Sequence, residues 1–174
     1  MNAYVLTGGR SRRMGESKAE MFLERVVAAA RPVFDEVTAV ERVAGCEWRV
    51  RTIVDEREGA IFGVLAALRD AQSRCFLLAV DYPLITADVL RFLRDDGRMP
   101  EWNGRPQPLC AVWDAAWLPR IEARIARGAL DLRGAIETEI IPESELRARF
   151  AGEPLLNVNT PEEWERAQRF LASG

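Results

Sequence analysis

Short apolar runs and longer amphipathic stretches alternate along the first half of this chain of 174 residues. The apolar runs predict strands, which we expect at residues 4–6, 37–40, 48–54 and 75–80. The amphipathic stretches predict helices at residues 19–30, 59–69 and 87–93, the last of them capped by Thr86. The run at 75–80 is almost wholly apolar, as expected for a central strand covered on both faces.

The second half of the chain has a less regular pattern. The stretch 95–108 is rich in glycine, proline and asparagine and predicts a long loop, of a kind that is usually functional or mobile in compact domains. Strands are expected at 109–113 and 155–158, helices at 115–127 and 161–171, and either a helix end or a short strand at 136–141.

Strands that alternate with helices predict a mostly parallel sheet with helices on both faces, which is a three-layer α/β sandwich. The length fits one domain spanning residues 1–174, and 48% apolar and 29% charged residues are ordinary for a globular protein. A net charge of −3 argues against a general nucleic-acid binder. With no apolar run near ~20 residues and no signal-peptide pattern, we expect a cytoplasmic protein without a membrane segment.

The residue types that are missing restrict the chemistry. The chain has no histidine, which excludes Ser-His-Asp triads and most zinc sites. Cys46, Cys75 and Cys110 are scattered and show no Cys-x-x-Cys spacing, so we interpret them as buried small hydrophobic residues. Chemistry is therefore expected to depend on carboxylates, amides, basic side chains and a hard metal ion.

The segment after the first predicted strand combines glycines with positive charge. Gly8, Gly9 and Gly15 allow the backbone N–H groups to approach an anion closely. The basic side chains of this segment suit phosphate oxygens and are Arg10, Arg12, Arg13 and Lys18. The spacing fits neither a P-loop nor a dinucleotide fingerprint, so the segment predicts a different loop for a triphosphate or pyrophosphate. The alternative is a solvated basic turn.

Two carboxylates follow predicted strands, Asp55 after the third and Asp81 after the strand at 75–80. Ligands of parallel α/β sheets bind where the carboxyl ends of the strands open, so both aspartates and the glycine-rich segment are expected at one edge. Mg²⁺ typically takes one or two carboxylates plus substrate phosphates, which makes Asp81 a candidate metal ligand. The alternative is that Asp81 only caps the next turn.

Four segments together resemble one family. The pattern Leu-x-Gly-Gly-x-Ser-x-Arg-Met-Gly-x-x-Lys over residues 6–18 resembles the signature of the nucleotidyltransferases that include molybdenum cofactor guanylyltransferase. Residues 55–65 are similar to the family's Asp followed by Gly-Pro-Leu-x-Gly, and 79–84 to its Cys-Asp-x-Pro turn. Residues 157–162 match its Asn-x-Asn-Thr-Pro-Glu almost completely. The order is the same, and the matches span almost the whole chain.

This resemblance implies a Rossmann-like nucleotidyltransferase fold and transfer of GMP from GTP to a phosphorylated pterin, molybdopterin, with release of pyrophosphate and with Mg²⁺ as cofactor. The implied catalytic residues are Arg13, Lys18 and Asp81, with Asp81 on the metal. The implied nucleotide-binding residues are Leu6, Thr7, Gly8, Gly9, Arg10, Lys18, Asp55, Gly59 and Asp81. Asn157 and Asn159 would bind the acceptor, although Asn159-Thr160-Pro161 also reads as an ordinary helix start. We interpret 95–108, with Trp102, Asn103 and Arg105, as a lid or docking surface for the acceptor.

The chain departs from the family pattern at three places. Ser17-Lys18 replaces Asp-Lys, Glu41 stands where the family has a nucleotide-contacting Asn, and the usual Gly-x-Pro-Leu after the lysine is missing. A carboxylate at Glu41 would repel a nearby triphosphate. Besides GTP and the pterin, the resemblance implies other molybdenum cofactor biosynthesis proteins and apo-molybdoenzymes as partners. Two other functions stay open: nucleotidyl transfer to another acceptor (cytidylyl transfer to molybdopterin, or a sugar or corrinoid phosphate), and nucleotide binding without turnover.

Overall fold

A five-stranded sheet forms the centre of the computed structural model, in the order β3-β2-β1-β4-β7. The structure describes residues 1–7, 18–42, 49–55, 57–132, 134–136 and 138–172. The first four strands in the order are mutually parallel, and β7 joins β4 antiparallel. Their bounds are β1 Ala3–Leu6, β2 Val37–Glu41, β3 Arg51–Val54, β4 Cys75–Ala79 and β7 Cys110–Trp113.

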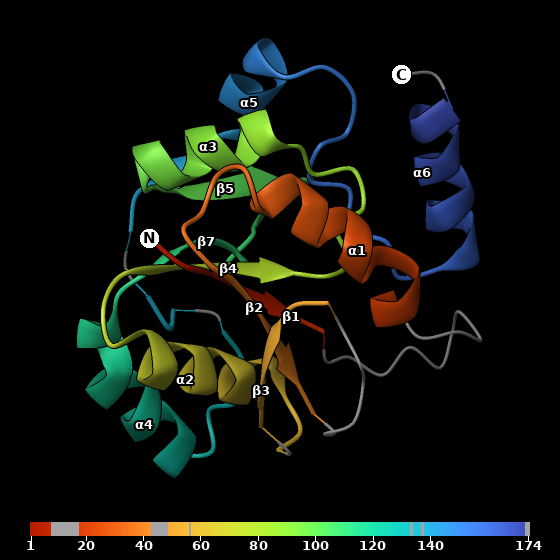
Figure 1. Ribbon diagram of the computed structural model, residues 1–174. Helices are drawn as coiled ribbons and strands as arrows, with labels where there is room; N and C mark the ends of the chain where they lie inside the picture. The colour runs from red at the N-terminus through yellow and green to blue at the C-terminus, as the bar shows by residue number, and fades with distance from the viewer. Residues whose placement is uncertain (8–17, 43–48, 56, 133, 137, 173–174) are drawn as a thin grey trace.

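Helices cover both faces of this sheet, so the predicted three-layer α/β sandwich is confirmed (Figure 1). One face carries α1 (Lys18–Ala30) and α3 (Ala87–Asp96), and the other carries α2 (Ala60–Ala71) and α4 (Leu118–Ala126), which follows a 3₁₀ turn at Ala115–Trp117. A smaller sheet joins β5 (Met99–Trp102) to β6 (Arg105–Pro106) and β8 (Ile140–Ile141). The last helices are α5 (Glu143–Arg149) and α6 (Pro161–Ala172).

Burial on both sides of the sheet explains why these apolar runs are strands. Side chains alternate along β1, so that Ala3 and Val5 join the core beneath α1 and α3, while Tyr4 and Leu6 join the core beneath α2. β1, β2 and β4 are buried at every position, as expected for parallel strands with helices on both faces. No helix of the described residues is long and apolar enough to cross a bilayer.

The helices of the first half begin and end close to the predicted positions. The Thr86 hydroxyl accepts a hydrogen bond from the Val89 N–H at 3.4 Å and caps α3 as predicted. Helix α2 begins after Gly59, whose φ of +127° is a conformation that side chains disfavour. Only Arg51–Val54 of the predicted strand 48–54 pairs as β3, and Trp48 lies outside the described residues.

Two predictions for the second half are wrong. The stretch 95–108 is not one long loop: it contains the end of α3 and the hairpin of β5 and β6. Trp102 is only 1% exposed, and the Arg147 guanidinium lies 4.3 Å from its ring, so this indole is a core residue and not part of a lid. Residues 155–158 are not a strand: Leu155, Leu156 and Val158 are apolar because they fill the core beside α1.

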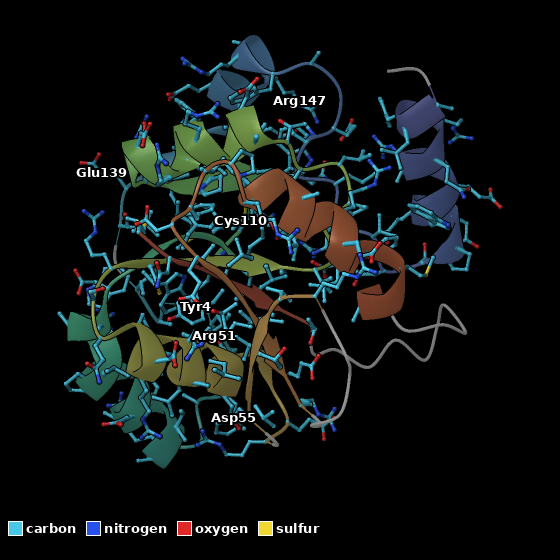
Figure 2. The ribbon with its side chains drawn as sticks, viewed as in Figure 1. Tyr4, Arg51, Asp55, Cys110, Glu139 and Arg147 are labelled. Carbon is cyan, nitrogen blue, oxygen red and sulfur yellow. The ribbon has the colours of Figure 1, made fainter. Side chains whose placement is uncertain are left out.

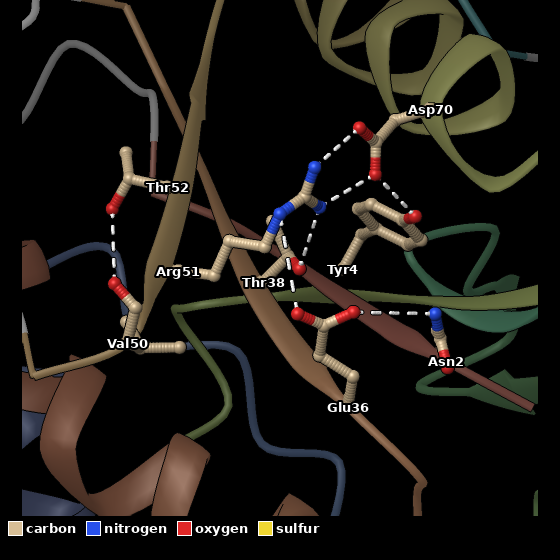
Figure 3. Close-up of polar contacts among 8 residues, drawn as sticks. All are labelled: Asn2, Tyr4, Glu36, Thr38, Val50, Arg51, Thr52 and Asp70. Carbon is tan, nitrogen blue, oxygen red and sulfur yellow. Dashed lines mark hydrogen bonds and ion pairs between the residues drawn. The ribbon is translucent and has the colours of Figure 1, made fainter.

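A hydrogen-bond network near the start of the edge strand β3 joins α2 to the sheet (Figure 3). Asp70 on α2 accepts two hydrogen bonds of 2.7 Å from the Arg51 guanidinium and one of 2.7 Å from the Tyr4 hydroxyl. These donors, Arg51 first, lower the pKa of Asp70 from 3.8 to about 2. The network joins the edge strand β3, the central strand β1 and α2 at one point.

We predict that Asp70→Asn destabilises the fold in a pH-dependent way. The lowered pKa is equivalent to about 2–3 kcal/mol, and because Arg51 is 44% exposed, screening reduces this to about 1–2 kcal/mol. The ionised carboxylate stabilises the folded state fully above pH ~4, and the effect is lost as the pH falls toward ~2. Urea unfolding should therefore separate wild type and variant clearly at pH 7 and by only about half as much at pH 3. An equal gap at both pH values would contradict this account.

The matched control is Glu122→Gln. Glu122 pairs with Arg69 at 2.7 Å, but both side chains are about half exposed. We expect its removal to change the free energy of unfolding by less than about 0.5 kcal/mol at either pH.

Candidate functional site

Backbone hydrogen bonds continue past the carboxyl ends of the parallel strands and form one row along the sheet edge. The Asp55 N–H donates to the Glu41 carbonyl at 2.8 Å, and the Thr7 N–H donates to the Val40 carbonyl at 3.1 Å. The Val80 N–H donates to the Leu6 carbonyl at 3.1 Å. The segments that follow β1, β2, β3 and β4 are therefore held side by side, and Asp55 and Asp81 belong to one edge as the sequence predicted.

A cavity of about 360 Å³ opens at this edge, between the strand ends and the start of α2. It is lined by Leu6, Val40, Glu41, Arg42, Asp55, Arg57, Glu58, Gly59, Ala60 and Gly63. Leu6, Asp55 and Gly59 were among the predicted nucleotide-binding residues. Thr7 is directly beside the cavity wall, but its hydroxyl already donates to the Val40 carbonyl at 3.0 Å.

Gly63 gives the cavity room on the helix side. A methyl group at this position would lie 3.1 Å from the Leu6 Cδ2 atom and 3.7 Å from the Val40 Cγ1 atom. Helix α2 therefore approaches the ends of β1 and β2 as closely as a residue without a side chain permits. Gly63 was not among the predicted nucleotide-binding residues. It is, however, the last glycine of the segment 55–65 that resembles the family's Gly-Pro-Leu-x-Gly, and a glycine inside a helical pattern also indicates close packing.

Asp55 has a partner within its own turn. Its carboxylate accepts hydrogen bonds from the Arg57 backbone N–H at 3.0 Å and from Nε at 2.9 Å, and it also pairs with the Arg57 Nη2. These bonds, the guanidinium first, lower the pKa of Asp55. The guanidinium also stacks 4.5 Å from the Phe62 ring centroid. Asp55 thus holds Arg57 as a fixed cation on the cavity wall (Figure 2 labels Asp55 near the end of β3).

Asp81 lies beside the predicted acceptor segment. Its backbone carbonyl accepts a 2.8 Å hydrogen bond from the Val158 N–H, which brings Asn157 and Asn159 to the turn after β4. The amide of Asn159 donates to the Asn157 side-chain oxygen, and Asn157 also bonds to the Tyr82 hydroxyl. Burial and the charge of Asp81 raise the pKa of the Cys110 thiol. The carboxylate is thus close enough to impose a negative potential on its buried neighbours.

The helix start at Asn159-Thr160-Pro161 is also present. Glu163 Oε2 accepts from the backbone N–H groups of Asn159 at 2.6 Å and Thr160 at 3.0 Å, while the Thr160 hydroxyl accepts from the Glu163 N–H at 3.2 Å. This reciprocal arrangement is a capping box at the start of α6. The start of α6 therefore accounts for Thr160 and Glu163 structurally, whether or not this segment also binds a ligand.

The glycine-rich segment falls outside the described residues, and with it Gly8, Gly9, Arg10 and Arg13. Of Lys18 the structure describes the backbone, at the start of α1. One turn further along α1, the Phe22 ring lies 4.9 Å from the ring of Trp164 in the first turn of α6. Since α6 follows Asn159, α1 begins at the same end of the sheet as the Asp81 turn.

Comparison with known proteins identifies the family. Residues 3–141 match the MobA-like NTP transferase domain. A probable molybdenum cofactor guanylyltransferase of Opitutus terrae is 32% identical, with 95% of this chain and 93% of that protein covered. One from Carboxydothermus hydrogenoformans is 28% identical over 97% and 95%. This chain belongs to the MobA-like NTP transferase family.

Solved structures agree with this assignment. The molybdopterin-guanine dinucleotide biosynthesis protein A of Archaeoglobus fulgidus superposes with a TM-score of 0.86 at 25% identity, and the match covers 100% of both chains. The 4-diphosphocytidyl-2C-methyl-D-erythritol synthase of Anaerococcus prevotii superposes at 0.64 with 11% identity, which shows a shared fold alone. The predicted Rossmann-like nucleotidyltransferase fold is confirmed.

In a MobA-like transferase the cavity beside Gly63 is a candidate nucleotide pocket, and we predict that Gly63→Ala weakens nucleotide binding. The added methyl would press on Leu6 and reduce the space at the strand ends. If the added methyl costs the ligand the contact of about one methylene group, the binding free energy falls by about 0.8 kcal/mol or slightly more. The Kd for a nucleoside triphosphate should then rise about threefold to tenfold. Calorimetric titration measures this change. The unfolding midpoint should alter little, because alanine also favours the helix. Unaltered affinity would show that the nucleotide does not use this wall.

Proposed function

We propose that this chain transfers GMP from GTP to the phosphate of molybdopterin in molybdenum cofactor, with release of pyrophosphate. The main support for the proposal is the arrangement of residues at the carboxyl edge of the sheet. A cavity lies at the ends of β1, β2 and β3, and backbone hydrogen bonds link these strand ends to the Asp81 turn and to the Asn157–Asn159 segment. Relatives named probable molybdenum cofactor guanylyltransferase match this chain in sequence over nearly its whole length, which also supports the proposal.

The reaction needs no strong general base. An acceptor phosphate is already ionised at neutral pH, and its oxygen attacks the α-phosphorus of GTP. The new P–O bond forms as the bond from the α-phosphorus to the bridging oxygen breaks, and pyrophosphate leaves with the electron pair. The chain contains no histidine, and positioning with charge stabilisation is sufficient for this chemistry.

The residues at this edge of the sheet fit a Mg²⁺ ion that would be coordinated by the protein and the substrate together. Among the described residues, no group of three or more acidic, cysteine or histidine side chains is arranged to hold a metal alone. Mg²⁺ usually takes one or two carboxylates and completes its shell with phosphate oxygens and water. Asp81 would supply the carboxylate, and when bound the ion would neutralise charge on the triphosphate.

The remaining roles follow the order of the strands. Leu6, Thr7, Gly59 and the Asp55–Arg57 pair would surround the base and ribose, and Asn157 and Asn159 would hold the acceptor phosphate near Asp81. Gly8, Gly9, Arg10, Arg13 and Lys18 would hold the triphosphate between them. The acceptor is a large polar pterin, and apo-molybdoenzymes or other proteins of molybdenum cofactor biosynthesis would be its sources and recipients.

We predict that Asp81→Asn lowers turnover at least ~10²-fold, the scale of removing one key electrostatic stabiliser. The assay follows pyrophosphate release with GTP, Mg²⁺ and molybdenum cofactor. The same panel run with CTP, ATP and UTP, and with sugar phosphates as acceptors, tests the other transfer reactions. Pyrophosphate from none of these mixtures would overturn the proposal in favour of binding without turnover.

The control for this variant is Asp88→Asn. Asp88 lies in the first turn of α3 and pairs with Arg91 on the exposed side of that helix. Its turnover should stay within about twofold of wild type, since an exposed ion pair of this kind contributes little to stability. Equal turnover of the Asp81 variant and wild type would remove Asp81 from the mechanism.

A further inference from the structure

Tyr82 lies directly after Asp81 and carries a hydroxyl group in the core of the protein. Its side chain is 2% exposed and belongs to the core beneath α1 and α3. A phenylalanine would fill the same space, and a buried hydroxyl is costly unless it is hydrogen-bonded. The Tyr82 hydroxyl donates to the Gln107 Oε1 atom at 2.8 Å, and it also bonds to the Asn157 side chain. It therefore joins the turn after β4 to two segments that are distant in sequence.

Gln107 follows β6 and is fixed to the hairpin of β5 and β6 by all of its donors. Its backbone N–H donates to the Pro100 carbonyl at 2.8 Å, and its side-chain NH₂ group donates to the carbonyls of Trp102 at 3.0 Å and Arg105 at 2.8 Å. A backbone carbonyl only accepts, so the NH₂ group must face the hairpin and the Oε1 atom must face Tyr82. The amide of Gln107 therefore has one possible orientation.

This orientation sets the direction of the hydrogen bonds that follow. Because the Oε1 atom of Gln107 can only accept, the Tyr82 hydroxyl donates its one hydrogen to it. The Tyr82 oxygen is then left as an acceptor, and Asn157 must turn its NH₂ group toward it. The Asn157 side-chain oxygen accordingly faces Asn159, whose NH₂ group donates to it. The four side chains thus form one chain of hydrogen bonds, in which each bond polarises the next.

The chain of hydrogen bonds ends at the two residues that are proposed to hold the acceptor phosphate. Asn157 and Asn159 lie in a segment that is neither helix nor strand. The bond between the Val158 N–H and the Asp81 carbonyl fixes the backbone of this segment but not the planes of the two amides. A phosphate group accepts hydrogen bonds, so its binding depends on which way the NH₂ groups face. Without the Tyr82 hydroxyl, the Asn157 amide would be free to turn over and exchange its donor and acceptor.

We propose that Tyr82 is a positioning residue for the acceptor phosphate. Its hydroxyl, fixed by Gln107 and by the hairpin of β5 and β6, orients the amides of Asn157 and Asn159. The inference rests on the proposed function and gives a role to a residue outside the predicted site. Tyr82 acts through the two amides and not by touching a substrate, because its side chain is buried. The hairpin contributes as a fixed support of the site and not as a lid over it.

The test compares wild type with Tyr82→Phe, which removes the hydroxyl and keeps the ring. Pyrophosphate release is followed while molybdenum cofactor is varied at saturating GTP and Mg²⁺, and GTP binding is measured separately by calorimetric titration. We expect kcat/KM for the acceptor to fall roughly ten- to hundredfold, the scale on which a small displacement of a positioning group acts. The Kd for GTP should be unchanged, because the backbone bond between Asp81 and Val158 remains. A parallel loss of GTP affinity would show that the whole turn has moved, and it would overturn the inference.

Tyr4→Phe is the matched control. The Tyr4 hydroxyl is buried on the other face of the sheet and donates to the Asp70 carboxylate at 2.7 Å. A hydrogen bond to a charged group contributes more to stability than a neutral one, so this variant should be at least as destabilised as Tyr82→Phe. Only Tyr82→Phe should lower kcat/KM for the acceptor. An equal loss in both variants would attribute the effect to stability and would contradict a positioning role.

A double-mutant cycle shows whether Tyr82 acts through Asn157. In an Asn157→Ala background, Tyr82→Phe should cause no further loss of kcat/KM. Additive losses, or an unchanged kcat/KM in Tyr82→Phe alone, would overturn the inference while guanylyl transfer stands. If wild type releases pyrophosphate with none of the acceptors, guanylyl transfer itself fails, and the inference fails with it.

Discussion

The parallel pairing of β1 with β2 on one side and with β4 on the other is the constraint on which the site depends. Parallel strands place all their carboxyl ends at one edge, and the backbone bonds beyond those ends fix the spacing of the following turns. Asp55, Glu41 and Asp81 come from different parts of the sequence, yet this pairing gives each a fixed place across the edge. The two cores on either side of the sheet hold the strands in that pairing.

Much of the first half could be predicted from the sequence because its signals are local. Because β1 and β4 are buried on both faces, their sequences are continuous apolar runs. The helices between them are recognisable from apolar residues repeated at helical spacing. The second half depends on contacts between distant residues. Trp102 lies in a stretch that reads as a loop, yet it is buried in the core, and Arg147 on α5 stacks on its ring. Leu155, Leu156 and Val158 have the composition of a strand, but they fill the core without entering the sheet.

In the candidate site, too, some residues could be placed from local sequence signals, while others depend on contacts between distant segments. The rule that ligands bind at strand ends was sufficient to place Asp55 and Asp81 at one edge. The contact of Asp81 with Val158 depends on a segment almost eighty residues away, and only the motif resemblance suggested it. Glu41 illustrates the limit most clearly. Its residue type is visible in the sequence, but its burial and the lack of a hydrogen-bond partner among the described residues are visible only in the structure.

The charged edge strand has a consequence for solubility. β3 ends the order of the five-stranded sheet and is only four residues long, and no strand of the described residues pairs with its outer side. Short length and charge are common means of preventing another strand from pairing at such an edge. Arg51 provides the charge, and Asp70 and Glu36 hold its guanidinium near the start of the strand. The network that fastens α2 to the sheet therefore also protects this border against edge-to-edge aggregation.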